Sequence, residues 1–328
     1  MGKGPREMDL PRIVVIGGGT GLSVMLRGLK TLPLDITAIV TVADDGGSSG
    51  VLRSEMQMPP PGDIRNVLLA LADVEPMLSK VLQHRFHEGS SLAGHSLGNL
   101  ILAAMKEITG DFVTAVKELS KVLAVRGQVL PASAQPIELI AEYTDGSQVR
   151  GESQIPKLGK PIRKVRIEPA NAVPLAEAVE AIGRADAIII GPGSLYTSII
   201  PNLIVPGIAS AVVRSKSVKI FVCNVMTQPG ETDHYSAGMH VKAIVQHVPD
   251  ITFDYILVND GLISPEVLKK YAEQGAEPVQ VDWEELDLTG AEIIADRLVL
   301  YRTYLRHDTE RLSEHISRIV HSWTAKKR

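Results

Sequence analysis

The sequence predicts an α/β protein with a Rossmann-like, doubly wound and mainly parallel sheet. Short apolar segments alternate with segments of helical periodicity along most of the 328 residues. Two of the apolar segments run directly into glycine-rich loops that are followed by amphipathic stretches. The chain is 45% hydrophobic but only 4% aromatic. Such a core of Val, Ile, Leu and Ala is typical of parallel sheets that helices cover on both faces.

The alternation predicts the individual elements. Strands are expected at 12–16, 37–42, 186–190, 218–223 and 254–258, with a shorter one near 279–282. Helices are expected at 21–31, 64–73, 76–86, 97–108, 111–124, 174–183, 235–247, 264–274 and 308–323. Residues 144–147 (Thr-Asp-Gly-Ser) separate two β-rich segments, as in a hairpin. We therefore expect a single α/β domain over residues 1–328 that carries a small antiparallel β insertion at 137–167.

Composition and charge exclude several classes of protein. The net charge of −4 gives no general basic field for nucleic acid. The single cysteine, Cys223, excludes a disulfide scaffold and a cysteine-based zinc site. The first 11 residues lack the apolar core of a signal peptide, and no apolar run is long enough to span a membrane. We expect a cytoplasmic homo-oligomer with a small-molecule ligand.

The first glycine loop, residues 17–21, lies between a strand and an amphipathic helix. Glycines let backbone N–H groups approach an anion closely, and a helix N-terminus adds roughly half a positive charge. The dinucleotide fingerprint fails because Leu22 and Val24 stand where its last glycine would be, and no P-loop lysine follows. The alternative is a tight turn that binds nothing. The candidate ligand contacts here are Gly18, Gly19, Thr20 and Gly21.

A second strand, glycine loop and helix occur at residues 188–198. Two such loops in one sheet suggest that two segments of one ligand meet in one crevice. Ser194 is a candidate N-cap, and Asn224 follows the strand 218–223 at the same carboxyl edge of the sheet. The candidate contacts here are Gly191, Pro192, Gly193, Ser194, Thr197 and Asn224.

Two adjacent acids, Asp44 and Asp45, follow the second strand. An acid at this edge can bind ribose hydroxyls or help to hold Mg²⁺. Adjacent acids usually point in different directions, so we expect one of them to face the ligand. The alternative is an Asp-Gly turn.

Two helix starts add weaker candidates. Residues 59–61 are prolines that stop a preceding helix, and Asp63 is well placed to cap the next one. Polar groups at the start of the helix near residue 97 could recognise ligand hydroxyls, the alternative being capping and close helix packing. The candidate contacts from these two segments are Gly62, Asp63, Arg65, Asn66, His95 and Asn99.

Evidence for nucleophilic or acid–base chemistry is thin. No Gly-x-Ser-x-Gly motif is present, Cys223 has no assignable partner, and no separated carboxylate pair stands out. The sequence therefore identifies no catalytic residue.

Taken together and in this order, the two glycine loops, the Ala-Asp-Asp-Gly-Gly-Ser-Ser-Gly segment at 43–50, and the segments 61–66 and 94–99 resemble the bacterial gluconeogenesis factor family (YvcK-type). That family is related to the 2-phospho-L-lactate transferases (CofD-like) of deazaflavin cofactor synthesis. The resemblance covers residues from about 12 to about 315. It implies a Rossmann-like fold, binding of UDP-N-acetylglucosamine, and a role in growth and cell shape on gluconeogenic carbon sources.

The resemblance also implies where the chain departs from the transferases. In those enzymes an acid matching Asp45, with Asp44 beside it, lies at the metal and substrate site. Residues 46–50 are small here, whereas the transferases carry bulkier residues that shape the deazaflavin pocket. We therefore expect a non-catalytic regulator that binds a nucleotide sugar. The alternatives are a Mg²⁺-dependent transferase acting on a phosphorylated substrate, and a protein that binds NAD(P) in the same crevice.

Overall fold

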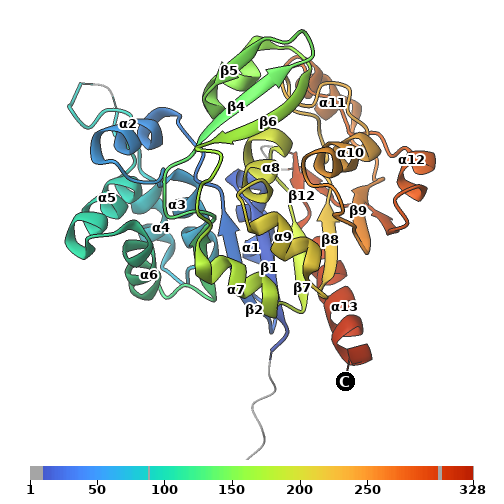
Figure 1. The fold of residues 1–328 in the computed structure, drawn as a ribbon, viewed down its shortest axis with the longest axis horizontal. Coiled ribbons are helices and arrows are strands. Elements are labelled where there is room, and N and C mark those ends of the chain that lie inside the picture. The colour runs from blue at the N-terminus through green and yellow to red at the C-terminus, as the bar shows by residue number, and fades with distance from the viewer. Residues whose placement is uncertain (1–9, 88, 302–304, 328) are drawn as a thin grey trace, which may run out of the picture.

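The computed structural model describes residues 10–87, 89–301 and 305–327, and it confirms the predicted fold class. Its centre is a seven-stranded sheet with the order β10-β9-β8-β7-β1-β2-β3, in which every neighbouring pair runs parallel (Figure 1). The strands are β1 (Arg12–Gly17), β2 (Asp35–Val40), β3 (Gln128–Pro131), β7 (Ala187–Ile190), β8 (Val218–Val222), β9 (Tyr255–Asn259) and β10 (Glu292–Asp296).

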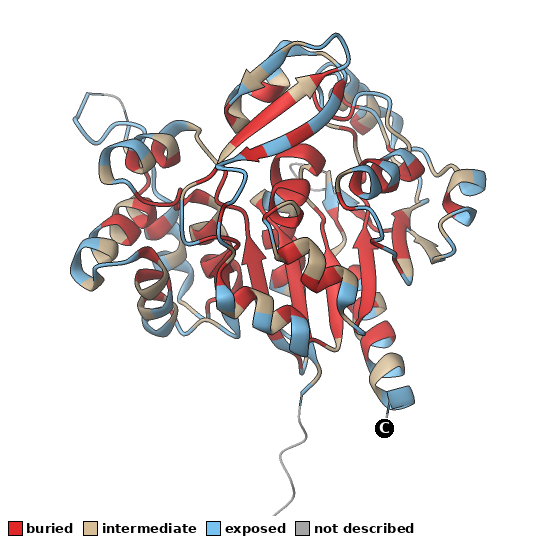
Figure 2. Cartoon of the chain, in the orientation of Figure 1, coloured by how far each residue is buried: buried red, intermediate tan, exposed pale blue. Residues whose placement is uncertain are grey.

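Helices cover both faces of the sheet, and the strands are buried throughout their centre (Figure 2). Along β1, Ile13 and Val15 join the core on one face, whereas Val14 and Ile16 join the core on the other. Burial on both faces explains why the strands read as uninterrupted apolar runs. The first face is covered by α1 (Gly19–Leu29), α3 (Gly62–Leu71) and α13 (Thr309–Lys327). The second is covered by α7 (Ala176–Arg184), α8 (Ile200–Leu203), α9 (Ile208–Arg214) and α10 (Ala237–His247).

The remaining helices lie around this centre. They are α2 (Gly47–Met56), α4 (Pro76–Gln83), α5 (Leu97–Thr109), α6 (Phe112–Val122), α11 (Pro265–Ala272) and α12 (Trp283–Asp287). Strand β1 pairs with β2 on one side and with β7 on the other, so the chain builds the sheet in opposite directions from β1. Such a switch in strand order opens a crevice at the carboxyl ends of the two strands, where ligands bind in open α/β sheets.

A small antiparallel sheet stands over the carboxyl ends of the central strands (Figure 1). It has the order β5-β4-β6 and is built from β4 (Glu138–Tyr143), β5 (Gln148–Arg150) and β6 (Ile162–Glu168), with a 3₁₀ helix, η1 (Glu152–Leu158), between β5 and β6. We call residues 138–168 the β flap. The flap is fixed to α10, because the Val165 N–H donates to Nε2 of His247 at 2.9 Å.

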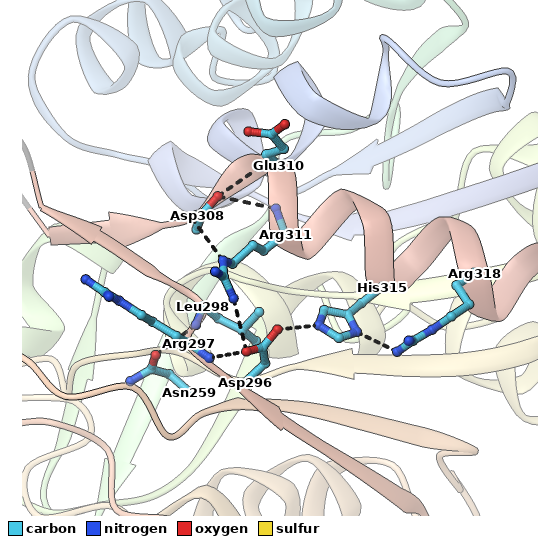
Figure 3. A network of polar contacts seen from close by, with 9 residues as sticks. All are labelled: Asn259, Asp296, Arg297, Leu298, Asp308, Glu310, Arg311, His315 and Arg318. Atoms are coloured by element: carbon cyan, nitrogen blue, oxygen red, sulfur yellow. Dashed lines mark hydrogen bonds and ion pairs between the residues drawn. The ribbon is translucent and has the colours of Figure 1, made fainter.

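The C-terminal part of the chain is tied to the sheet by a polar network (Figure 3). Asp296, at the end of β10, accepts hydrogen bonds from Nε2 of His315 at 2.8 Å and from Arg311 at 3.3 Å. Between β10 and α13 the chain forms a hairpin of β11 (Val299–Tyr301) and β12 (Leu305–His307). The buried His307 anchors this hairpin, since its Nε2–H donates to the Cys223 carbonyl at 3.1 Å.

Most predicted elements are present within a few residues of their expected bounds, but the strand expected at 279–282 was wrong. That segment is irregular: Val279 is buried and its N–H donates to the Val225 carbonyl, which is itself in a loop. The elements that were not predicted include the edge strands β3 and β10, the helices α2, α8, α9 and α12, and the β11–β12 hairpin. Helix α2 begins in the glycine-rich segment 46–50, for which the sequence predicted no helix.

Candidate functional site

The two glycine loops lie side by side because β1 and β7 are neighbours in the sheet. The Gly191 N–H donates to the Ile16 carbonyl at 3.0 Å, and a Cβ at Gly193 would lie 3.2 Å from the Gly18 carbonyl oxygen. Gly191 has a φ of +81°, and a Cβ there would meet the Val222 carbonyl oxygen at 2.8 Å. The loops therefore need glycine in order to approach one another and the next strand.

The glycine N–H groups of the second loop form hydrogen bonds within the protein. The side chain of Asn224 brackets Gly193, accepting from its N–H at 3.2 Å and donating to its carbonyl at 2.8 Å. Ser194 does not cap the following π-helical turn, η2 (Leu195–Ile199), through its side chain; its Oγ accepts a hydrogen bond from Gln228 at 2.7 Å. This loop thus shapes the crevice wall, and its glycine N–H groups already have partners.

The position of Asp63 differs from the helix-capping position that the sequence predicted. It lies within the first turn of α3, whose N-cap is Pro61, and its carboxylate does not cap that helix. Instead it faces the first glycine loop, where a Cβ at Gly18 would lie 2.6 Å from its Oδ2 and where it accepts a backbone hydrogen bond from Gly19. Desolvation by the surrounding protein, reinforced by the charge of Asp44, raises the pKa of Asp63 to about 6.

The two adjacent acids diverge, as expected. Oδ1 of Asp44 accepts the Gly46 N–H at 2.9 Å, and its other oxygen faces Gly62 at the start of α3. Oδ1 of Asp45 accepts the Ser153 N–H of the β flap at 2.8 Å. Asp44 therefore lies in the crevice beside Asp63, whereas Asp45 fastens the flap to the end of β2.

A cavity of about 380 Å³ opens beside Asp44 and Asp63. Its wall contains a chain of polar side chains from α2, α3 and α5. The Arg65 guanidinium donates to Ser96, to Asn99 at 2.8 Å and to Asn66 at 2.7 Å. Oγ of Ser48 accepts from Asn99 at 3.1 Å and contacts Nδ1 of His95 at 3.0 Å. The sequence-predicted Arg65, Asn66, His95 and Asn99 thus come together.

A second cavity, of about 280 Å³, adjoins the first glycine loop and shares Asn66 with the first cavity. It lies along one side of α1. Two arginines, Arg27 of α1 and Arg306 of β12, face it; burial and the charge of Arg306 lower the pKa of Arg27. No carboxylate of the described residues forms an ion pair with either guanidinium. Sequence reasoning missed both arginines. The lining residues are Thr20, Ser23, Arg27, Asn66, Leu69, Gln83 and Arg306.

Two further acids, also missed from sequence, complete the acidic side of the crevice. Glu231 accepts a hydrogen bond from Oγ1 of Thr197 at 3.1 Å, and burial raises its pKa to about 7. Glu152, at the start of η1, has a pKa raised well above its usual range, first by burial and then by Asp44 and three other acids. The crevice therefore has an end rich in acids under the β flap, which Arg65 and Arg85 also line, and an end beside α1 that arginines line without any acid. We call these the acidic end and the guanidinium end.

The acids do not form a metal centre made by the protein alone. Among the described residues, no three His, Cys, Asp or Glu side chains converge closely enough to hold a metal ion. A Mg²⁺ ion here would take most of its ligands from a phosphorylated ligand and water. Among the residues that the structure describes, no single helix is long and apolar enough to cross a membrane. The one bent helix pair of suitable composition, at 195–214, lies mostly in the core.

The strand order and the polar crevice define a Rossmann-like α/β protein with its candidate site at the switch between β1 and β7. The family model described as 2-phospho-L-lactate transferase CofD matches residues 13–299. The chain belongs to this CofD-like family, and its relatives carry the name gluconeogenesis factor.

The similarity extends over almost the whole chain. The "Gluconeogenesis factor" of Bacillus subtilis is 57% identical over 304 residues, which cover 92% of this chain and 96% of that protein. The protein of the same name from Halalkalibacterium halodurans is 56% identical and covers 94% of this chain and 96% of its own length. A crystal structure of a UPF0052 family protein from Bacillus halodurans superposes with a TM-score of 0.92 at 56% identity, covering 94% of this chain and 99% of that one.

Proposed function

We propose that this protein is a regulator that binds a nucleotide sugar of the UDP-N-acetylglucosamine type and supports growth and cell shape on gluconeogenic carbon sources. Two sources support the proposal. The family resemblance implies the ligand class and the physiological role. The crevice supplies, in one continuous place, groups that suit the two chemically different halves of such a ligand.

The observation that carries the proposal is the pair of guanidinium groups at the second cavity, which extends along α1 from Thr20 to Arg27. Arg27 and Arg306 face the same cavity, and no described carboxylate neutralises either. Both arginines are exposed and so can reach a ligand in the cavity, and guanidinium groups match phosphate oxygens in bidentate geometry. Thr20 adds a hydroxyl group from the first turn of α1. This end suits a diphosphate.

The acidic end suits the uncharged half of the ligand. Asp44, Asp63 and Glu152 supply hydrogen-bond acceptors for sugar hydroxyls at this end. Asn66 lines both cavities and therefore lies between the two ends. A nucleotide sugar has the same order of groups, with a diphosphate joined to a polyhydroxylated ring.

A thermal-shift panel tests the proposal. Purified protein is heated with UDP-N-acetylglucosamine, UDP-glucose, NAD⁺, NADP⁺ and a guanosine monophosphate conjugate, each with and without Mg²⁺. A ligand present at 100 times its dissociation constant stabilises the folded state by about 2.7 kcal/mol. We expect the two UDP-sugars to raise the melting temperature. A rise with NAD⁺ or NADP⁺ alone would replace the proposal with the dinucleotide alternative.

A Mg²⁺-dependent transferase is the second candidate, and the acidic cluster is the observation that favours it. Asp44, with Asp63 near by, could share a cation with the phosphates of a bound nucleotide. Incubation with UDP-N-acetylglucosamine, Mg²⁺ and candidate acceptors, followed by chromatography of the nucleotide, separates the two. We expect no turnover. Steady release of UMP or UDP that Asp44→Asn abolishes would establish the transferase.

A further inference from the structure

Glu152 is in a position that the fold alone does not justify. Its Oε2 is buried and has no hydrogen-bond partner. Its carboxyl group also faces the charges of four other acids, which are Asp44, Asp63, Glu231 and Asp45. A buried acceptor without a donor, surrounded by like charges, destabilises the folded protein unless a proton or an external donor satisfies it.

The β flap holds Glu152 in this position from both sides. The preceding residue, Gly151, has a φ of +94° and packs closely against Oδ2 of Asp45. The following residue, Ser153, donates its N–H to Oδ1 of Asp45 at 2.8 Å. Ile155, three residues after Glu152, is fully buried, and its carbonyl accepts a hydrogen bond from the Tyr143 hydroxyl at 2.9 Å. These contacts hold the Glu152 carboxyl group near Asp44 and Asp63, which line the cavity of about 380 Å³.

We propose that Glu152 is a ligand contact that the β flap carries over the acidic end of the crevice, where its carboxylate accepts hydrogen bonds from hydroxyl or amide N–H groups of the sugar. This inference rests on the proposed function and deepens it, because it assigns the sugar-recognising residue to the flap. In the free protein the unpartnered oxygen lacks a donor, and the bound sugar supplies it. Contact with the sugar also stabilises the closed position of the flap.

The same surroundings define the class of sugar. Asp44, Asp63 and Glu152 offer hydrogen-bond acceptors at this end of the crevice, so a ring with hydroxyl and amide substituents fits better than a ring bearing a carboxylate. UDP-glucose and UDP-glucuronate differ only in that a CH₂OH group is replaced by a carboxylate. Wild-type protein is therefore expected to bind UDP-glucose at least about 10-fold more tightly, since one unfavourable charge contact costs about 1.4 kcal/mol or more.

Calorimetric titration of UDP and UDP-N-acetylglucosamine into three proteins tests the assignment. The proteins are wild type, Glu152→Gln, which keeps the shape but removes the charge, and Gln154→Ala, a control at an exposed position of the same turn. We expect the wild type to bind UDP-N-acetylglucosamine more tightly than UDP. Glu152→Gln should lose about 10-fold of that advantage and bind UDP as the wild type does, because a hydrogen bond to a charged group is worth more than one to a neutral group. Gln154→Ala should behave as the wild type.

The outcomes separate the two proposals. Equal affinity ratios in wild type and Glu152→Gln, or equal affinities of the wild type for UDP and UDP-N-acetylglucosamine, would overturn the assignment of Glu152 and leave nucleotide binding intact. Absence of any binding to the wild type would overturn the proposed function and this assignment with it. If Glu152→Gln does not fold, Glu152→Ala serves in its place, and the loss should be at least as large because the acceptor is removed entirely.

Discussion

Gly18 shows how one missing side chain positions the site. A Cβ there would lie 2.6 Å from Oδ2 of Asp63 and 2.8 Å from Cγ2 of Thr41, so α3 could not approach the first glycine loop. Gly18→Ala should lower the free energy of unfolding by about 1–3 kcal/mol, the usual cost of overpacking. Urea denaturation measures the change.

Gly183 provides the matched control for that substitution. It lies inside α7, and a Cβ there would meet no atom within 4 Å. Gly183→Ala should therefore raise the free energy of unfolding, by up to about 1 kcal/mol, through helix propensity. Equal effects of the two substitutions would contradict the close approach at Gly18.

The buried acids give stability a characteristic dependence on pH. Burial raises the pKa of Glu231 from 4.5 to about 7 and that of Asp63 from 3.8 to about 6. At pH values between the ordinary and the raised pKa of each group, the folded state therefore holds more protons than the unfolded state. Their contribution is fully present below about pH 4 and is lost as the pH rises towards 7. Each group changes the free energy of unfolding by up to about 1.4 kcal/mol per pH unit in its window.

Glu231→Gln removes one of these titrations. Urea unfolding at pH 5, 6, 7 and 8 should show a flatter decline of stability in the variant than in the wild type. Glu55→Gln, at an exposed position of α2, should leave the wild-type decline unchanged. A Glu231→Gln profile parallel to the wild-type profile would show that this carboxyl group titrates normally.

The arginine pair carries the charge-dependent part of the proposal. Arg27→Gln keeps a polar side chain but removes one guanidinium, so it should raise the dissociation constant for UDP about 10–100-fold, the value of one or two charge-assisted hydrogen bonds. The loss should shrink at high salt. Arg214→Gln, exposed at the end of α9, is the control and should bind UDP as the wild type does. Unchanged binding by Arg27→Gln would place the phosphates elsewhere.

At the scale of elements, the β flap depends on one side chain of the main sheet. Asp45 accepts the Ser153 N–H, and this contact links η1 to the end of β2. Asp45→Ala should therefore speed amide hydrogen exchange at Ser153 and along η1, because the flap opens more often. Asp145→Ala, at the tip of the β4–β5 turn, removes a side chain that contacts only the flap itself and should not change exchange in η1. Protection of η1 that survives Asp45→Ala would contradict this anchoring role.

Elements with strong periodicity could be predicted from sequence, and those determined by their neighbours could not. Strand β1 has an apolar run with a glycine loop after it, and α1 has a clear amphipathic pattern. Strand β3 has four residues and ends in a proline, which only an edge strand tolerates. Helix α2 begins Gly-Ser-Ser-Gly, a composition of low helix propensity, and it forms because Ser48, Ser49 and Leu52 are buried against its neighbours.

At the scale of the whole molecule, the strand order creates the site. The sequence predicted both glycine loops and Asp44 at the carboxyl edge because strand–loop–helix order is visible locally. It could not place Glu152, Glu231, Arg27 or Arg306 there. Glu152 arrives on the flap and Arg306 on a hairpin nearly 280 residues after Arg27, so their meeting depends on the topology and not on any local pattern. A capping role was predicted for Asp63, but its carboxylate faces Gly18 of the first glycine loop instead.

A crystal structure of the protein with UDP-N-acetylglucosamine tests the central claim most directly. The account predicts that the diphosphate lies between Arg27 and Arg306, that Asn66 lies beside the bond to the sugar, and that a sugar hydroxyl or amide group lies within hydrogen-bond distance of Glu152 under the β flap. A nucleotide bound with its phosphates among the acids, or outside the crevice between β1 and β7, would contradict it.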